Sequence, residues 1–194
     1  MKIVFLDAEY TGQHAMTTLV SLGLVTLEGD ELAVALDDYA DEQVTPWLRE
    51  HVLSEIDPRV RVSSADAYRR VAAWIDRYAS GERVHLVSAG LGSDLLLFFE
   101  LWKHGVTDGH RFHALYDLPP SLAHAQHFDL NTLLFACGHD PDADRERLIA
   151  ETLATGGHRH DALHDARVVR ECFLTLLPHP AMQRFVHETV AGTK

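Results

Sequence analysis

The sequence predicts an α/β domain in which a mixed β-sheet, antiparallel over its first three strands, is flanked by helices. Two observations lead to this prediction. Three apolar segments separated by short turns open the chain, and helical segments alternate with short apolar strands over the remainder. Neighbouring strands joined by turns pair antiparallel, whereas alternating helices and strands build a sheet with helices on its faces. A doubly wound α/β order also agrees with this pattern.

The first three strands are predicted from apolar, β-branched composition. Residues 2–8 form a short apolar segment, and residues 17–27 (TTLVSLGLVTL) are apolar and β-branched. The acidic cluster at residues 28–30 is typical of a turn, and residues 31–39 (ELAVALDDY) return as a third strand. These segments are expected to form an antiparallel meander.

Helix-start and helix-stop residues mark the rest of the chain. Pro46 occupies the first turn of a short helix, where its missing N–H costs nothing, and Ser64 is expected to cap a longer helix. Asp161 caps the last long helix and Pro178 ends it. The expected helices are residues 45–56, 64–78, 93–105, 130–137, 144–152, 162–177 and 181–190, and the expected later strands are residues 84–88 and 112–116.

Length and composition indicate a single globular domain, residues 1–194, since no repeat or Pro/Gly-rich linker divides the chain. Hydrophobic residues make up 46% and charged residues 24%, which excludes the disordered class. No apolar run approaches the roughly 20 residues that span a bilayer. Asp7 and Glu9 interrupt the opening apolar segment, unlike a signal peptide, so the chain is expected to be cytoplasmic and without membrane contact.

The formal net charge of −12 argues against a protein that coats nucleic acid, which would present a basic face. It does not exclude an enzyme that grips a few nucleotides, because bound metal ions can neutralise phosphates. The two cysteines, Cys137 and Cys172, lack a CxxC spacing and lie in apolar segments. They are expected to be buried free thiols.

Asp7 and Glu9 are the first candidate site residues. Residues two apart on a strand point to the same face, so the two carboxylates project together and repel each other. A hard divalent cation bound through oxygens would relieve that repulsion. The alternative is an exposed strand end on which both side chains are simply solvated.

Two further acids stand at predicted helix starts. Asp94 follows a buried strand and a glycine-rich turn, and Asp165 lies in the first turn of the last long helix. The helix dipole alone would also favour an acid at such a position. His160 precedes that helix in a Gly-rich loop, and histidine is the side chain that can accept a proton near neutral pH, as a general base must.

Three motifs carry a resemblance to a known family. Asp7-Ala8-Glu9-Tyr10-Thr11-Gly12 matches DxExTG, Asp94 is a central Asp, and residues 160–166 (HDALHDA) match HxAxxDA. Together they resemble the DEDDh family of 3′–5′ exonucleases, of the ribonuclease H-like superfamily, over nearly the whole chain. The segment TPWLREHVLSEI, the short length and the acidic character are similar to a small stand-alone bacterial exoribonuclease branch of that family.

The resemblance implies a ribonuclease H-like fold and a metal-dependent 3′–5′ exoribonuclease that releases nucleoside monophosphates from RNA 3′ ends. The lack of a basic face suggests that these ends are single-stranded or overhanging. The resemblance also implies two Mg²⁺ or Mn²⁺ ions, one held by Asp7, Glu9 and Asp165, with Asp7 bridging to a second that Asp94 supports. His160 would be the general base. The terminal nucleotide would lie near Ala8, Thr11 and Gly12, and a homodimer is implied.

One feature departs from the family pattern. The middle motif usually carries an Asn, often as His-Asn, a few residues before its Asp. Here that region is Ser88-Ala89-Gly90-Leu91-Gly92. The contacts of that Asn, and the substrate preference linked to them, are therefore left open.

Other interpretations also remain open. A zinc site is suggested by the spacing of His158, His160 and His164 and by the HxxH pair His124 and His127, although the HExxH glutamate is missing. On the exonuclease interpretation His164 is expected to be a solvated helical residue. A DNA exonuclease of the proofreading type and a non-catalytic nucleic-acid-binding or scaffold domain are the alternative functions.

Overall fold

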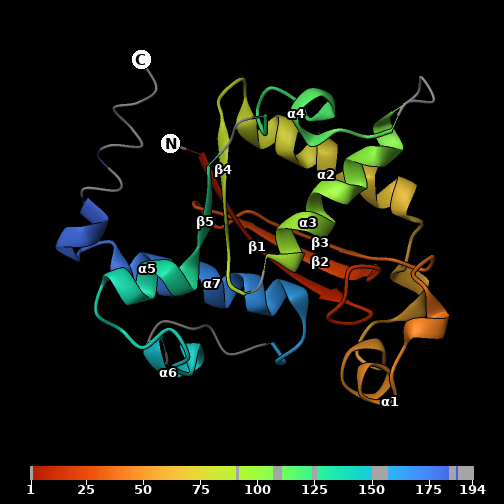
Figure 1. Ribbon diagram of the computed structural model, residues 1–194, viewed down its shortest axis with the longest axis horizontal. Helices are drawn as coiled ribbons and strands as arrows, with labels where there is room; N and C mark the ends of the chain where they lie inside the picture. The colour runs from red at the N-terminus through yellow and green to blue at the C-terminus, as the bar shows by residue number, and fades with distance from the viewer. Residues whose placement is uncertain are drawn as a thin grey trace.

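The protein is built on one five-stranded mixed sheet. The computed structural model describes residues 2–90, 92–106, 111–123, 126–149, 157–183 and 187. The strand order is β3-β2-β1-β4-β5, with β1 at the centre (Figure 1). The pairs β1–β2 and β2–β3 are antiparallel, whereas β1–β4 and β4–β5 are parallel. The predicted mixed sheet, antiparallel over its first three strands, is confirmed.

The sequence of β1 explains its central place. Val4, Phe5 and Leu6 are completely buried, and consecutive residues alternate between two apolar clusters on opposite faces. Val4 and Leu6 belong to the cluster that packs under helices α2 and α3, while Ile3 and Phe5 belong to the cluster under α5 and α7. A strand that is apolar on both faces is stable only between two helical layers.

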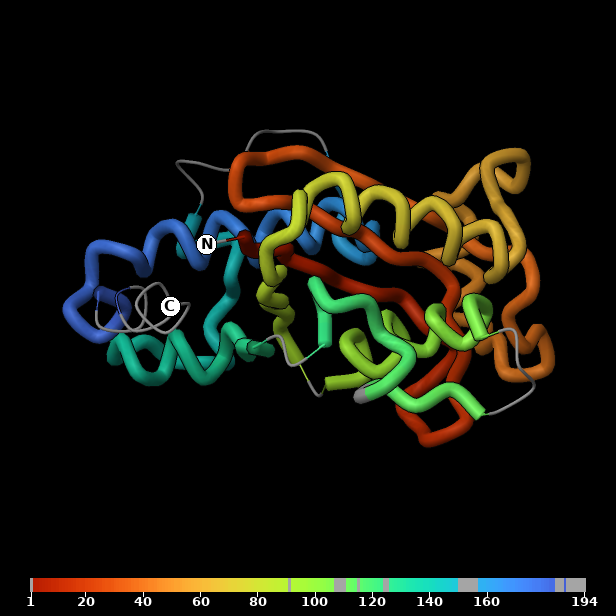
Figure 2. Tube along the Cα trace, turned by 90° about the horizontal axis from the view of Figure 1, so that it is seen from above, coloured from red at the N-terminus to blue at the C-terminus, as the bar shows by residue number. Residues whose placement is uncertain are grey.

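The helices form those two layers. Figure 1 shows α2 and α3 on one side of the sheet and α5 and α7 on the other, and Figure 2 shows α2 lying over the first three strands. In α2 the side chains of Ala67, Val71, Trp74 and Ile75 are buried at helical spacing. Its N-cap is Ser63, one residue before the predicted cap.

The elements have the following bounds. The strands are β1 Lys2–Tyr10, β2 Leu19–Thr26, β3 Glu31–Ala35, β4 Val84–Ser88 and β5 His127–Asp129. The α-helices are α1 Pro46–Leu48, α2 Ser64–Ala79, α3 Ser93–Glu100, α4 Ala114–Asp117, α5 Leu130–Ala136, α6 Arg145–Leu148 and α7 Ala162–Leu176. Short turns of other helix types are Asp41–Gln43, Arg49–Leu53, Pro58–Val60 and Leu101–Gly105.

One predicted strand is wrong. Residues 112–116 do not pair with the sheet: Ala114–Asp117 is helix α4, and Phe112 only packs against the core. The edge strand is instead β5, whose three residues pair with β4. The predicted helices 144–152 and 181–190 lie partly outside the described residues.

Both cysteines are buried free thiols, as predicted. Among the described residues, no helix is long and apolar enough to cross a membrane.

Candidate active site

The predicted site residues converge at the carboxyl end of the parallel strands β1 and β4. Parallel pairing joins residues 2–5 of β1 to β4, so Asp7 and Glu9 lie where β1 extends beyond its partner. Asp94 lies in the first turn of α3, the helix that follows β4, and Asp165 lies in the first turn of α7. These four acids, His160, Ala8, Thr11 and Gly12 all line one cavity of about 450 Å³.

A glycine in β2 allows α7 to reach the acids of β1. Gly23 is paired with Asp7, and a Cβ atom at residue 23 would lie 2.2 Å from the carbonyl oxygen of Ala162. The start of α7 therefore rests directly on the backbone of β2. The side chain of Asp161 accepts a hydrogen bond from the Leu163 amide and caps the helix. Asp165 is thereby placed beside the centre of the sheet.

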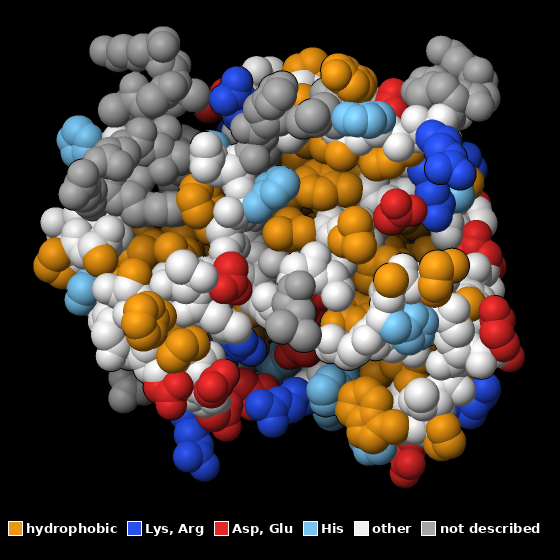
Figure 3. Space-filling view, in the orientation of Figure 1, with side chains coloured by type: hydrophobic (Ala, Val, Ile, Leu, Met, Phe, Trp, Pro, Cys, Tyr) orange, Lys and Arg blue, Asp and Glu red, His pale blue; other side chains and the backbone are white. Residues whose placement is uncertain are grey.

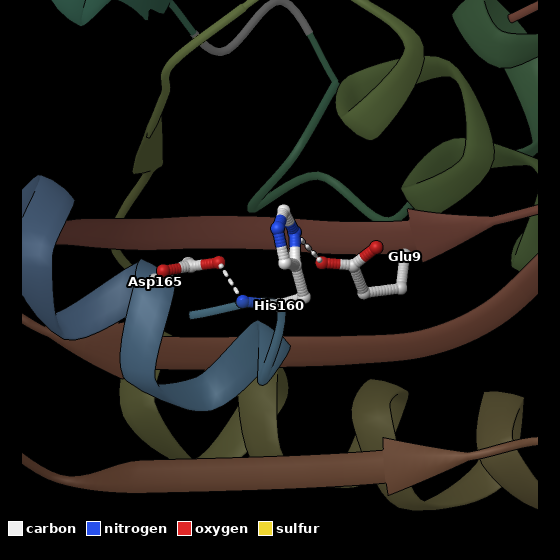
Figure 4. Close-up of side chains that lie close together, drawn as sticks. All are labelled: Glu9, His160 and Asp165. Carbon is white, nitrogen blue, oxygen red and sulfur yellow. Dashed lines mark hydrogen bonds and ion pairs between the residues drawn. The ribbon is translucent and has the colours of Figure 1, made fainter. Parts of the chain in front are cut away.

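His160 is anchored through its backbone and its ring. Its φ of 71° lies in the left-handed region, which is uncommon for a residue with a side chain. Its N–H donates to Asp165 Oδ2 at 3.0 Å, and its Nδ1 lies 3.6 Å from Glu9 Oε1 (Figure 4). The ring meets the half-exposed Trp47 edge to face, with centroids 4.9 Å apart. The histidine thus lies against the acids rather than outside their cluster.

Asp94 is held by the backbone of β1. It is buried, and the backbone N–H of Ala8 lowers the pKa of its carboxyl group against the larger effect of burial. The preceding turn contains Gly90, whose φ of +142° disfavours any side chain. Within the region in which the DEDDh family carries an Asn, Ala89 and Gly90 line the cavity.

Burial raises the pKa values of all four acids, and repulsion from neighbouring carboxylates adds to this effect at Asp7 and Glu9. Burial, followed by repulsion from the other carboxylates, raises the pKa of Asp7 well above its usual range and that of Glu9 to about 8. Burial raises the pKa of Asp94 to about 7 and also raises that of Asp165. Such a cluster favours either bound protons or a bound cation.

The donor set suits a divalent ion. Within the described ranges, one group of three side chains offers ligand atoms within 4.8 Å of one another: Glu9, His160 and Asp165. The first ion was expected on Asp7, Glu9 and Asp165; Glu9 and Asp165 belong to this group, and Asp7 lines the same cavity. Carboxylate oxygens supply most of the available donors, as hard cations prefer.

Thr11 and Gly12 line the cavity but use their polar groups internally. Thr11 is 2% exposed, and its hydroxyl donates to Gln43 Oε1 at 2.6 Å and accepts from the Thr18 amide. The Gly12 amide donates to the Thr17 hydroxyl. These residues shape the wall of the cavity, and their hydroxyl and amide groups already have partners.

The histidines do not gather into a zinc site in the described part of the chain. His164 is 4% exposed, and its Nε2 faces Glu146 Oε1 at 3.3 Å, so the expectation that it is solvated is wrong. A helix face that packs against α6 and the loop at Gly157 explains its burial. His158 lines a different cavity from Glu9 and Asp165, and His127 lies on β5. His124 is outside the described residues.

Comparison with solved structures supports the fold. Over 96% of this chain, the structure is similar to E. coli exonuclease I in complex with a dA16 oligonucleotide, with a TM-score of 0.62 and 11% sequence identity. The catalytic unit of Neurospora crassa Pan2, containing its protease and nuclease domain, matches over 100% of this chain at a TM-score of 0.48 and 14% identity. This chain spans 43% of the first and 30% of the second. No family model and no curated protein sequence matches the chain.

The likeness to exonuclease I, together with the order of the sheet and its two helical layers, confirms the predicted ribonuclease H-like fold class.

Proposed function

We propose that this protein is a metal-dependent 3′–5′ exonuclease that releases nucleoside monophosphates from the 3′ ends of RNA. The observation that carries the proposal is the convergence of four acids with raised pKa values beside a histidine. These acids come from three separate elements. Burying four carboxylates together costs folding free energy. Such clusters are found mostly at functional sites, where the charges bind a cation or take part in catalysis.

The acids would hold two divalent ions, Mg²⁺ or Mn²⁺. Glu9 and Asp165 would bind one ion, with Asp7 between it and a second ion that Asp94 supports. When bound, such ions polarise the phosphodiester and favour ionisation of the attacking water. The fit rests on the oxygen-rich donor set and on the repulsion that the cations would relieve.

His160 is the proposed general base. Its side chain is 39% exposed, so water can reach the ring, while the hydrogen bond from its backbone N–H to Asp165 fixes its place. The ring would take a proton from the attacking water. Glu9, beside Nδ1, would stabilise the imidazolium that forms.

The cavity offers a place for one terminal nucleotide. Ala8, Thr11 and Gly12 form one wall, and the half-exposed Trp47, which lines the same cavity, provides an aromatic ring against which a base could pack. The resemblance to the DEDDh family supports 3′–5′ polarity and RNA as substrate. We further propose, from the composition of the chain, that residues 1–194 act as one domain in the cytoplasm, and, from the resemblance, that the protein is a homodimer.

The test uses RNA and DNA oligonucleotides labelled at either the 3′ or the 5′ end, incubated with Mg²⁺, Mn²⁺, Zn²⁺ or a chelator. We expect loss of the 3′ label first, as a mononucleotide, with Mg²⁺ or Mn²⁺ and not with the chelator. The Asp7→Asn variant should be inactive, and Asp41→Asn, an exposed change outside the site, should match the wild type. Release of the 5′ label first, or activity in the chelator, would contradict the proposal.

Two alternatives are outcomes of the same test. Faster cleavage of DNA than of RNA would indicate a DNA exonuclease, a substrate class suggested by the dA16 bound to exonuclease I. Binding of oligonucleotides without metal-stimulated cleavage would indicate a non-catalytic domain.

A further inference from the structure

A second cavity, of about 440 Å³, lies on the other side of the acids. It shares Asp7, Ala89, His160 and Asp165 with the first cavity. Its other walls come from residues 141–146, from Arg159 and from α7. Figure 3 shows acidic and basic side chains gathered at the lower edge of the view, around α6. Asp7 and Asp165 therefore lie where the two cavities meet.

Arg145 gives the second cavity a positive charge that is not neutralised by a direct partner. Its Nη2 donates to Asn131 Oδ1 at 2.7 Å, and its buried Nε has no acceptor. Across the described residues, Arg145 forms no ion pair with a carboxylate. Its charge nevertheless acts on the site, because it lowers the pKa values of Asp7 and Asp94 against the larger effect of burial.

The helix that carries Arg145 is fixed to α7. Glu146, the next residue, faces the buried His164 at 3.3 Å, and the backbone carbonyl of Arg145 accepts a hydrogen bond from Cys172 Sγ. A Cβ atom at Gly157 would overlap the His164 ring, so the loop before α7 packs closely on the same histidine. The guanidinium is therefore presented from a supported position rather than from a free surface side chain.

We propose that Arg145 binds the phosphate one nucleotide 5′ of the scissile bond and that the second cavity receives that part of the strand. This inference rests on the proposed function. The scissile phosphate must lie at the acids, two of which, Asp7 and Asp165, line both cavities, and the terminal nucleotide fills the cavity beside Trp47. The strand then continues into the second cavity, where a guanidinium matches a phosphate with two parallel hydrogen bonds.

The test compares two dinucleotides in Mn²⁺. One has a free 5′ hydroxyl and contains only the scissile phosphate, whereas the other carries a 5′ phosphate and so adds the phosphate that Arg145 would bind. The wild type should prefer the phosphorylated dinucleotide in kcat/KM by about 10- to 100-fold, the size expected of a charge-assisted contact. Arg145→Gln should bring that ratio close to one.

Arg147→Gln is the matched control, because Arg147 lies on the same helix with its side chain 88% exposed and should leave the ratio unchanged. Arg145→Lys retains the charge but lacks the planar guanidinium group, so its preference for the phosphorylated dinucleotide should be intermediate. This variant tests the inference even if Arg145→Gln does not fold. Equilibrium binding of both dinucleotides in Ca²⁺ gives a readout independent of turnover, and Arg145→Gln should weaken only the phosphorylated one.

The other outcomes overturn the inference. If Arg145→Gln lowers kcat/KM equally for both dinucleotides, Arg145 either contacts the scissile phosphate or acts only through its charge on the acids. A wild type without preference for the 5′ phosphate would refute the subsite and leave the exonuclease function standing. If the wild type cleaves neither dinucleotide nor any longer oligonucleotide, the proposed function falls as well.

Discussion

Glu9→Gln should stabilise the metal-free protein at alkaline pH. The pKa of Glu9 is raised from 4.5 to about 8 in the fold, chiefly by burial and then by the charges of Asp165 and Asp94. Between these two pH values the unfolded chain has released the proton and the folded chain still holds it. Stability therefore falls as pH rises through this window, and the loss is complete above about pH 8.

The magnitude follows from the same pKa values. A change from 4.5 to about 8 in one carboxyl group corresponds to roughly 5 kcal/mol at most, since each tenfold change in proton affinity is worth about 1.4 kcal/mol. The side chain is only 14% exposed, so solvent screens this cost weakly. Compared with a typical total stability of about 5–15 kcal/mol, a cost of this size is readily measured.

The assay is urea unfolding in a chelator at pH 5 and at pH 8.5. At pH 5 the folded wild type carries a neutral Glu9, which Gln imitates in shape, so the variant and the wild type should differ by less than about 1 kcal/mol. At pH 8.5 the variant should be more stable by several kcal/mol. Glu42→Gln, at an exposed position, serves as the control and should show no such difference.

Addition of Mn²⁺ completes the experiment. The wild type should gain stability at pH 8.5 because the ion replaces the protons that the acids would otherwise need, and Glu9→Gln should gain much less. If Glu9→Gln destabilises the metal-free protein equally at both pH values, Glu9 is a structural residue and the electrostatic reasoning fails.

Three further variants test the site. Asp7→Ala should abolish cleavage while the fold persists, which activity and circular dichroism measure together; retention of a tenth of the wild-type rate would contradict its assignment. His160→Ala should lower kcat by about 10²–10⁴-fold and leave the Mn²⁺ affinity within threefold of the wild-type value. His139→Ala, at an exposed position, is the control, and loss of bound Zn²⁺ from His160→Ala would indicate a zinc site instead. Gly23→Ala should cost about 1–3 kcal/mol in unfolding and at least tenfold in kcat, because its Cβ would displace the Ala162 carbonyl; an unchanged variant would show that α7 can move without consequence.

Local signals in the sequence were sufficient for the elements that carry the acids. Strand β1 could be predicted because it is continuously apolar up to Asp7, and α7 because Asp161 caps it before a helical pattern of apolar residues. These signals are independent of distant parts of the chain. For that reason the predicted acids fall at element boundaries and meet in the structure.

Nonlocal contacts account for what was missed. Strand β5 has three residues without alternation, and it exists because β4 offers a free parallel edge. The burial of His164 depends on α6 and on the loop at Gly157 packing against one face of α7. A glycine inside an otherwise apolar strand, Gly23, was the available signal that another backbone approaches closely there.

The raised pKa values of the buried acids determine how metal binding should depend on pH. Both faces of β1 are buried, so the strand stays in place although Asp7 and Glu9 at its end carry raised pKa values. Protons and divalent cations compete for the same oxygens, and Glu9 and Asp94 hold their protons up to about pH 8 and pH 7. Metal affinity should therefore increase with pH until these groups ionise, since every proton displaced on binding contributes up to tenfold per pH unit. Burial of these acids and the repulsion between them destabilise the metal-free fold when the acids are ionised, and a bound cation offsets that cost.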